Sequence, residues 1–300
     1  MKTVLIIALI LLVVGVLLAG AGWVLLQKYP IQQNVVKDTI YPYDISQVPT
    51  CIDITTLDSR VEILPIEGDE WRVVCRETED RNHTVELVDG VLTIRQNGDT
   101  RKWYEYIGVL KAFQKPSIIL LLPKQTYESL SVHSVSGSIQ VQEGFAFSTA
   151  NLQNGSGFIL CNSSIEGDLN VENTSGSIYI TGGVGGKLEA RNVSGSITVK
   201  GATPTRVTIK NTSGSIHLVD VVCQGDCEID NTSSSIELER CDAASFDLRT
   251  VSGGIRASIL SGKVFDCHST SGGVHVPANS EGGTFKARTT SGGIRVIIVE

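Results

Sequence analysis

A short phrase, Ser-Gly-x-aliphatic with small variations, recurs nine times in the second half of the chain. Each closing aliphatic follows the previous one after 19 or 20 residues. A fixed period of this size is typical of a stacked repeat. The glycines and closing aliphatics that define it are Gly137, Ile139, Ile159, Gly176, Ile178, Gly195, Ile197, Gly214, Ile216, Ile236, Gly253, Ile255, Gly272, Val274, Gly292 and Ile294.

Three further apolar columns accompany the phrase. Residues nine and seven positions before the closing aliphatic, and two positions after it, are apolar in every copy, whereas the residues between them are mostly polar. This alternation predicts strands with one buried face, two in each copy, joined by a glycine-bearing bend. Because no helical pattern intervenes, we expect an all-β, parallel single-stranded β-solenoid with 19–20-residue coils, β-helix-like and right-handed by the rule for parallel crossovers.

A small polar residue stands five positions before each closing aliphatic. Stacked polar side chains can bond to one another and to the backbone of the bend, which predicts a structural ladder. The alternative is a flat polar face that binds sugar or ordered water. Five consecutive copies carry asparagine at this position: Asn154, Asn173, Asn192, Asn211 and Asn231.

The chain begins with an apolar segment. Residues 4–26 carry no charge and are flanked by Lys2 and Lys28. Such a segment would span about 34 Å as a helix, enough to cross a hydrocarbon core. We therefore expect residues 1–28 to form a transmembrane anchor; the alternative is a signal peptide cleaved at Ala-Gly-Ala, residues 19–21. The amino terminus adds a positive charge on the Lys2 side, which predicts a single-pass protein of the cell membrane with its C-terminal domain outside the cytoplasm.

Three regions follow the anchor. Residues 29–46 contain two prolines and are expected to form a linker. Residues 47–128 alternate without the glycine phrase and predict a β-rich N-terminal cap for the solenoid of residues 129–300. Within the cap, residues 101–113 place apolar side chains on one helical face. This pattern favours a lid on the cap's own core; the alternative is a helix that touches a membrane or a partner.

The chain offers little in the way of reactive chemistry. No metal site or cofactor is expected, because no pair of ligand motifs has zinc spacing. Of the seven cysteines, Cys51 with Cys75 and Cys223 with Cys241 are the pairs whose predicted placement would allow a disulfide. Many β-solenoids cleave polysaccharides, but no cleft pattern surrounds the richest carboxylate group, so we expect no enzyme activity. That group consists of Asp226, Glu228, Asp230, Glu237 and Glu239.

Several segments together resemble the bacterial putative-adhesin family of β-strand-repeat proteins, DUF4097. They are the N-terminal apolar segment, Leu92-Thr-Ile-Arg, Lys102-Trp-Tyr-Glu-Tyr-Ile-Gly108, Pro116-Ser-Ile-Ile-Leu-Leu-Leu-Pro123 and the Ser-Gly-Ser-Ile series. The resemblance covers the chain from about residue 45 onward. It implies a β-solenoid, often membrane-anchored in Gram-positive bacteria and sometimes linked with envelope-stress systems, and it implies no catalytic residue.

These observations predict a non-catalytic, membrane-anchored envelope protein that acts as an adhesin or surface-binding module. The alternatives are a structural or sensory envelope-stress component that acts through membrane-protein partners, and a polysaccharide-acting enzyme. The expected partners are the membrane, through residues 4–26, and a cell-wall glycan or an envelope protein. A net charge of −7 argues against nucleic acid. No sequence remains to cover the strand Ile294 to Val299, so we expect it to be the last rung, open to end-to-end contact.

Overall fold

The computed structural model describes residues 15, 37–41, 48–77, 81–97, 116–279 and 281–299. The chain divides into two units, residues 1–36 with 100–114, and residues 37–99 with 115–300. Apart from Gly15, the first unit lies outside the described residues, and so do the predicted anchor and the predicted helix over 101–113. Among the described residues, no helix has the length and apolar character needed to cross a membrane.

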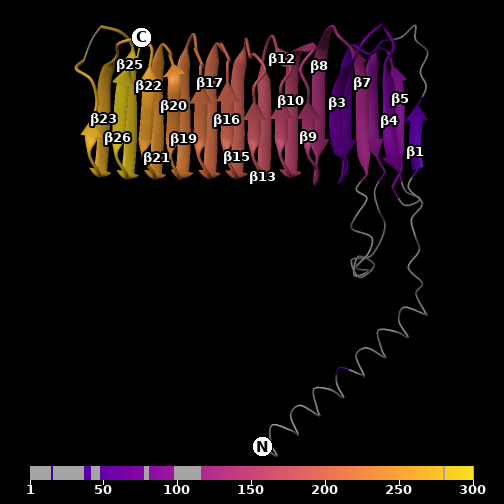
Figure 1. The fold of residues 1–300 in the computed structure, drawn as a ribbon, viewed down its shortest axis with the longest axis horizontal. Coiled ribbons are helices and arrows are strands. Elements are labelled where there is room, and N and C mark those ends of the chain that lie inside the picture. The colour runs from indigo at the N-terminus through magenta and orange to yellow at the C-terminus, as the bar shows by residue number, and fades with distance from the viewer. Residues whose placement is uncertain are drawn as a thin grey trace, which may run out of the picture. The chain divides into compact units, whose positions relative to one another are not determined.

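The described residues of the second unit are all-β and form two sheets of 13 strands each. Figure 1 shows the strands of both sheets side by side along the unit, from β1 to β23. Sheet 1 contains, in spatial order, β1 (Lys37–Tyr41), β4 (Arg72–Glu77), β7 (Ser117–Pro123), β3 (Arg60–Ile66), β9 (Ile139–Val141), β11 (Ile159–Cys161), β14 (Ile178–Ile180), β16 (Ile197–Lys200), β18 (Ile216–Val219), β20 (Ile236–Cys241), β22 (Ile255–Ile259), β26 (Ile294–Ile298) and β24 (Val274–His275).

Sheet 2 carries the other strand of each coil. Its spatial order is β23 (Val264–Ser271), β25 (Thr284–Ser291), β21 (Ser245–Ser252), β19 (Asp226–Ser233), β17 (Arg206–Ser213), β15 (Lys187–Ser194), β13 (Leu169–Ser175), β10 (Ala146–Ser156), β8 (Thr126–Ser134), β2 (Cys51–Thr56), β6 (Val91–Gln96) and β5 (His83–Val88), with the short β12 (Ser164–Ile165) beside β10.

The repeat coils pair in parallel, as the 19–20-residue period predicted. Equivalent residues of successive coils are register partners, such as Ile178 with Ile197 and Ile197 with Ile216. The closing aliphatics and the three apolar columns point between the sheets and form one continuous core. The parallel β-solenoid is therefore confirmed for residues 126–298. The exceptions in these columns are Val274 and Val276, 38% and 36% exposed, with Phe265 and Cys267 partly buried.

Those exceptions all belong to one coil, and they mark a difference from the expected stacking order. The last strand, β26, pairs with β22 on one side and β24 on the other. Its sheet 2 partner, β25, lies between β21 and β23 in the same way. The prediction that Ile294 to Val299 forms the uncovered last rung is therefore wrong. After β22, the chain leaves one level of the stack empty and forms β23 and β24 at the level beyond it. It then returns, and β25 and β26 occupy the empty level. The exposed edge of the stack is therefore formed by β23 and β24.

The cap combines parallel and antiparallel pairing. β2 and β3 continue the solenoid, because they pair in parallel with β8 and β9. β6 and β7 form the next level, also in parallel. β4 and β5 then reverse direction and pair antiparallel with β7 and β6. Residues 37–41, expected in the linker, instead form β1, an antiparallel strand on β4.

All seven cysteines are free thiols. Cys51 and Cys75 were expected on neighbouring strands, and this is wrong: Cys51 lies on β2 in sheet 2, whereas Cys75 lies on β4 in sheet 1. Cys223 and Cys241 are both buried. Burial raises the pKa of Cys241 to about 11, so this thiol stays protonated and packs as a small apolar group.

Candidate binding surface

The bend between the two strands of a coil fixes what each coil presents to solvent. In the middle coils the phrase glycine has a positive φ, 120° at Gly195 and 119° at Gly214, a region that favours glycine. Close stacking is a second reason for glycine here. A Cβ on Gly195 would lie 2.3 Å from the carbonyl oxygen of Gly176 on the preceding coil.

The asparagine ladder points inward beneath these bends. Asn154, Asn173, Asn192, Asn211 and Asn231 are each 4–5% exposed. The Asn192 amide nitrogen donates to the carbonyl oxygens of Gly176 (2.9 Å) and Gly195 (3.0 Å), and it thereby joins two successive bends. The amides therefore bond to the bend carbonyls rather than to one another. These hydrogen bonds connect neighbouring bends beneath the outer surface.

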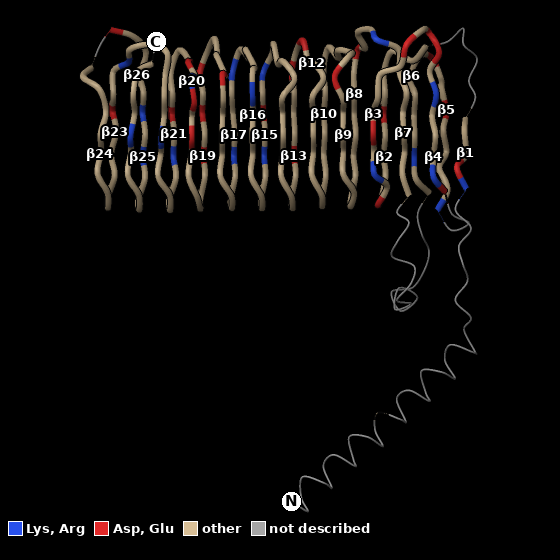
Figure 2. Tube along the Cα trace, in the orientation of Figure 1, with Lys and Arg blue, Asp and Glu red and all other residues tan. Residues whose placement is uncertain are grey.

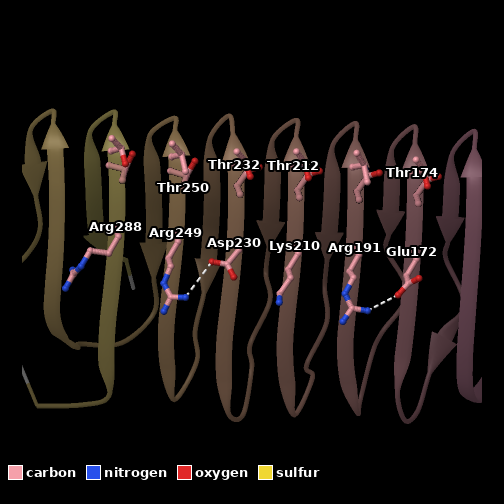
Figure 3. Close-up of a pocket in the computed structure, with 18 of the residues that line it drawn as sticks. Glu172, Thr174, Arg191, Lys210, Thr212, Asp230, Thr232, Arg249, Thr250 and Arg288 are labelled. Atoms are coloured by element: carbon pink, nitrogen blue, oxygen red, sulfur yellow. Dashed lines mark hydrogen bonds and ion pairs between the residues drawn. The ribbon is translucent and has the colours of Figure 1, made fainter.

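The outer face of sheet 2 carries two parallel rows of side chains above that ladder. We call them the charged row, six positions before the closing aliphatic, and the threonine row, four positions before it. Figure 3 shows both rows along the strands. In spatial order the charged row is Glu172, Arg191, Lys210, Asp230, Arg249, Arg288 and His268, and the threonine row is Thr174, Val193, Thr212, Thr232, Val251, Thr290 and Thr270.

The two rows line a long, shallow groove. It has a volume of about 1050 Å³ and reaches from His133 on β8 to His268 on β23. The charged row contributes four basic side chains and two carboxylates to this groove, although the whole chain has a net charge of −7. The lining thus has two more cations than carboxylates, whereas three carboxylates just outside it, Glu189, Asp247 and Asp266, pair with Arg191, Arg249 and Arg288. Figure 2 shows that basic and acidic residues are otherwise interspersed along the strands from β15 to β25.

Ion pairs hold the charged row in place. Arg191 reaches Glu172 on the preceding coil at 2.8 Å, and Arg249 lies 3.8 Å from Asp230 (Figure 3). The hydrogen bond that Arg191 donates to Glu172 raises the pKa of Arg191 further, so this cation is permanent. Arg288 pairs with Asp266 at 2.6 Å. Exposed pairs of this kind are worth about 0–1 kcal/mol, so an anionic ligand can replace the protein carboxylate with little loss.

The carboxylates singled out from the sequence do not form one group. Asp226, Glu228 and Asp230 lie on β19 in sheet 2, whereas Glu237 and Glu239 lie on β20 in sheet 1. The two strands of one coil face opposite sides of the unit, and the sequence alternation alone could not show this split. Most of these carboxylates have a cationic neighbour, such as Arg206 for Asp226 at 2.6 Å and Arg256 for Glu237 at 3.2 Å.

Three comparisons place the chain among known proteins. No curated protein matches it in sequence. Among solved structures, a putative adhesin from Bacteroides fragilis is 15% identical with a TM-score of 0.45, and the match covers 88% of this chain and 97% of the other. A putative lipid binding protein from Parabacteroides distasonis is 13% identical with a TM-score of 0.41, over 89% and 98% of the two chains.

A putative cell adhesion protein from Clostridium sporogenes is 8% identical with a TM-score of 0.24, over 88% of this chain and all of the other. Likenesses at this level carry no functional argument. The sequence profile of the Toastrack DUF4097 family, in contrast, matches residues 50–187 and again residues 164–300, which together cover most of the chain. This chain belongs to the Toastrack DUF4097 family.

Proposed function

We propose that the chain is a non-catalytic binding module of the cell envelope, and that the groove on sheet 2 holds an extended anionic glycan. The observation that carries the proposal is the groove lined by four basic side chains, whose charged and threonine rows repeat once per coil. Adjacent strands are about 4.8 Å apart, so a ligand lying along the groove meets equivalent groups at regular intervals. Arginine and lysine bind carboxylate or phosphate groups, and threonine hydroxyls bind sugar hydroxyls.

The spacing of the groove carboxylates supports a binding role rather than hydrolysis. Glu172 on β13 and Asp230 on β19 are separated by three strand steps, which is about 14 Å. Glycosidases hold their two carboxylates about 5–9.5 Å apart. Both side chains are also engaged by arginines, Glu172 by Arg191 and Asp230 by Arg249.

Binding of the full-length chain to polyglucuronate, alginate and neutral dextran tests the proposal. We expect saturable, salt-sensitive binding to the two acidic polymers and none to dextran. Lys210→Glu should weaken binding about tenfold, because it reverses a charge in the middle of the groove. Arg256→Glu is the matched control, since Arg256 lies on β22 in sheet 1 and its side chain is 71% exposed. Equal loss in both variants, or no binding to either polymer, would refute the groove as the site.

Residues 4–26 support attachment of this module to the membrane, with the groove outside the cytoplasm. Retention of the chain in membranes after carbonate washing tests the attachment, and a mature amino terminus after residue 21 would refute it. If no glycan binds and a membrane protein co-purifies with the chain, a structural or sensory envelope component becomes the better description.

A further inference from the structure

The end of the cap contains a cluster of ligand-type side chains that the groove does not use. Cys75 and Glu77 lie on β4, and His83 lies at the start of β5. One ligand atom from each residue lies within 4.8 Å of the other two. The imidazole is fully buried, Cys75 is 0% exposed, and the Glu77 side chain is 12% exposed. We propose that Cys75, Glu77 and His83 bind a zinc ion.

The chain positions the three residues by its local structure. Cys75 and Glu77 are two residues apart on one strand, so both side chains point to the same face. The chain then reverses, and β5 begins with His83, whose backbone nitrogen donates to Glu77 Oε1 at 2.6 Å. That contact fixes the imidazole beside the carboxylate, with Nδ1 3.1 Å from Oε1. The site is therefore built from one strand and the start of the next, and its donor atoms converge.

The far side of the imidazole has the partner that a metal-bound histidine needs. His83 Nε2 lies 3.1 Å from Ser59 Oγ, and Ser59 Oγ lies 3.2 Å from Gln96 Oε1. Gln96 Oε1 also accepts from Leu57 N at 2.8 Å, so the Ser59 hydroxyl can donate either to Gln96 or to His83 Nε2. When it donates to Gln96 it accepts the Nε2 proton, and the lone pair of Nδ1 is then available to a metal. A histidine that ligates metal through one nitrogen commonly donates through the other in this way, and zinc would replace the direct contact between Nδ1 and Glu77 Oε1.

The donor set selects the metal. Thiolate, imidazole and carboxylate are the three ligand types of zinc sites, and the thiolate disfavours magnesium and calcium, which prefer oxygen ligands. Three protein ligands leave the fourth tetrahedral position open. The hydroxyls of Thr39 and Tyr41 on β1 donate to the Glu77 carboxylate at 2.6 and 3.1 Å. Binding removes the Cys75 thiol proton to solvent and leaves a neutral imidazole and a carboxylate on the metal.

Metal content and cobalt spectroscopy of the full-length chain test the site. We expect one zinc per chain after dialysis, and a thiolate-to-cobalt charge-transfer band when cobalt replaces it. The melting temperature should rise with zinc, because a ligand that binds only the folded state stabilises it. Cys51→Ser is the matched control: Cys51 lies on β2, in the other sheet, and should leave all three readouts unchanged.

Cys75→Val keeps an apolar side chain of similar size at the buried position and should abolish the cobalt band and the zinc-dependent rise. Ser59→Ala should weaken zinc affinity about tenfold, as expected when the partner of a ligating histidine is lost. Circular dichroism without metal establishes that each variant is folded. If folded Cys75→Val and the wild type take up zinc equally, or if neither shows a cobalt band, the cluster is only a hydrogen-bonded network and the proposal is refuted.

Discussion

At the residue scale, the bend glycine meets two independent demands, a positive φ and a close approach to the preceding coil. The Ser-Ser-Ser-Ile copy breaks the pattern, since Ser234 stands at the glycine position with a φ of 118°. A residue with a Cβ is strained there by about 1–3 kcal/mol. We therefore expect Ser234→Gly to raise the free energy of unfolding by about 1 kcal/mol, measured by denaturant titration.

The equivalent position in an earlier coil gives the control in the opposite direction. Gly195→Ala should lower the free energy of unfolding by about 2 kcal/mol or more, because its Cβ would lie 2.3 Å from the Gly176 carbonyl oxygen. If Ser234→Gly is neutral or destabilising, the strain that it relieves in the folded state is no larger than the cost of the conformational freedom that glycine adds to the unfolded chain.

A second residue-scale effect concerns the ion pair between the buried Lys263 and the partly exposed Asp242, whose Nζ and Oδ1 atoms are 2.8 Å apart. Burial raises the pKa of Asp242, but hydrogen bonds from Lys263, Ser261 and the Ala243 backbone outweigh it, and the net shift is downward. A lowered folded-state pKa contributes stability above the unfolded value, about 3.9, and this stability is lost as pH falls below it. The difference in unfolding free energy between wild type and Asp242→Asn should therefore be constant at neutral pH and shrink below about pH 3.9. A difference that does not change with pH would contradict this assignment.

At the element scale, the sequence predicted strand positions and facing well, because both follow from the period-two alternation. It did not predict which coils are neighbours at the C-terminal end, where the last two coils stack in the opposite order to the chain. The repeat makes every coil a good partner for every other, so the sequence pattern does not distinguish sequential stacking from insertion. In the observed order, Gly283 passes so close to the Ala244 carbonyl oxygen that a Cβ would lie 1.6 Å from it. The sequence pattern also gave no sign of the Cys75, Glu77 and His83 cluster, because these residues lie outside the repeat and converge only when β4 and β5 reverse.

In the structure β26 lies between β22 and β24. This order and stacking in chain order predict opposite results for substitutions in β24 and β26. Ile294 is 1% exposed between two coils, whereas Val274 is 38% exposed on the open edge. We expect Ile294→Ala to lower the free energy of unfolding by about 3 kcal/mol and Val274→Ala by less than about 1 kcal/mol. Denaturant titration of both variants measures the difference. A larger loss for Val274→Ala would show that β24 is an inner strand and β26 the outer one.

At the scale of the whole molecule, a repeat protein gains stability from the interfaces between adjacent coils, so removing an inner coil costs two interfaces and removing an outer one costs one. Deletion of residues 280–300 removes β25 and β26, which the structure places inside the stack. Without them, β23 loses its parallel partner β25, and the Val264 nitrogen loses the Gly283 carbonyl that accepts its hydrogen bond at 3.0 Å. We therefore expect the amides of residues 264–275 to lose protection from hydrogen exchange, while β8 to β18 keep theirs. The full-length chain is the reference for each amide. If the coils stacked in chain order, β23 would pair with β21, and the deletion would remove only its outer neighbour β25. The amides of residues 264–275 would then stay protected.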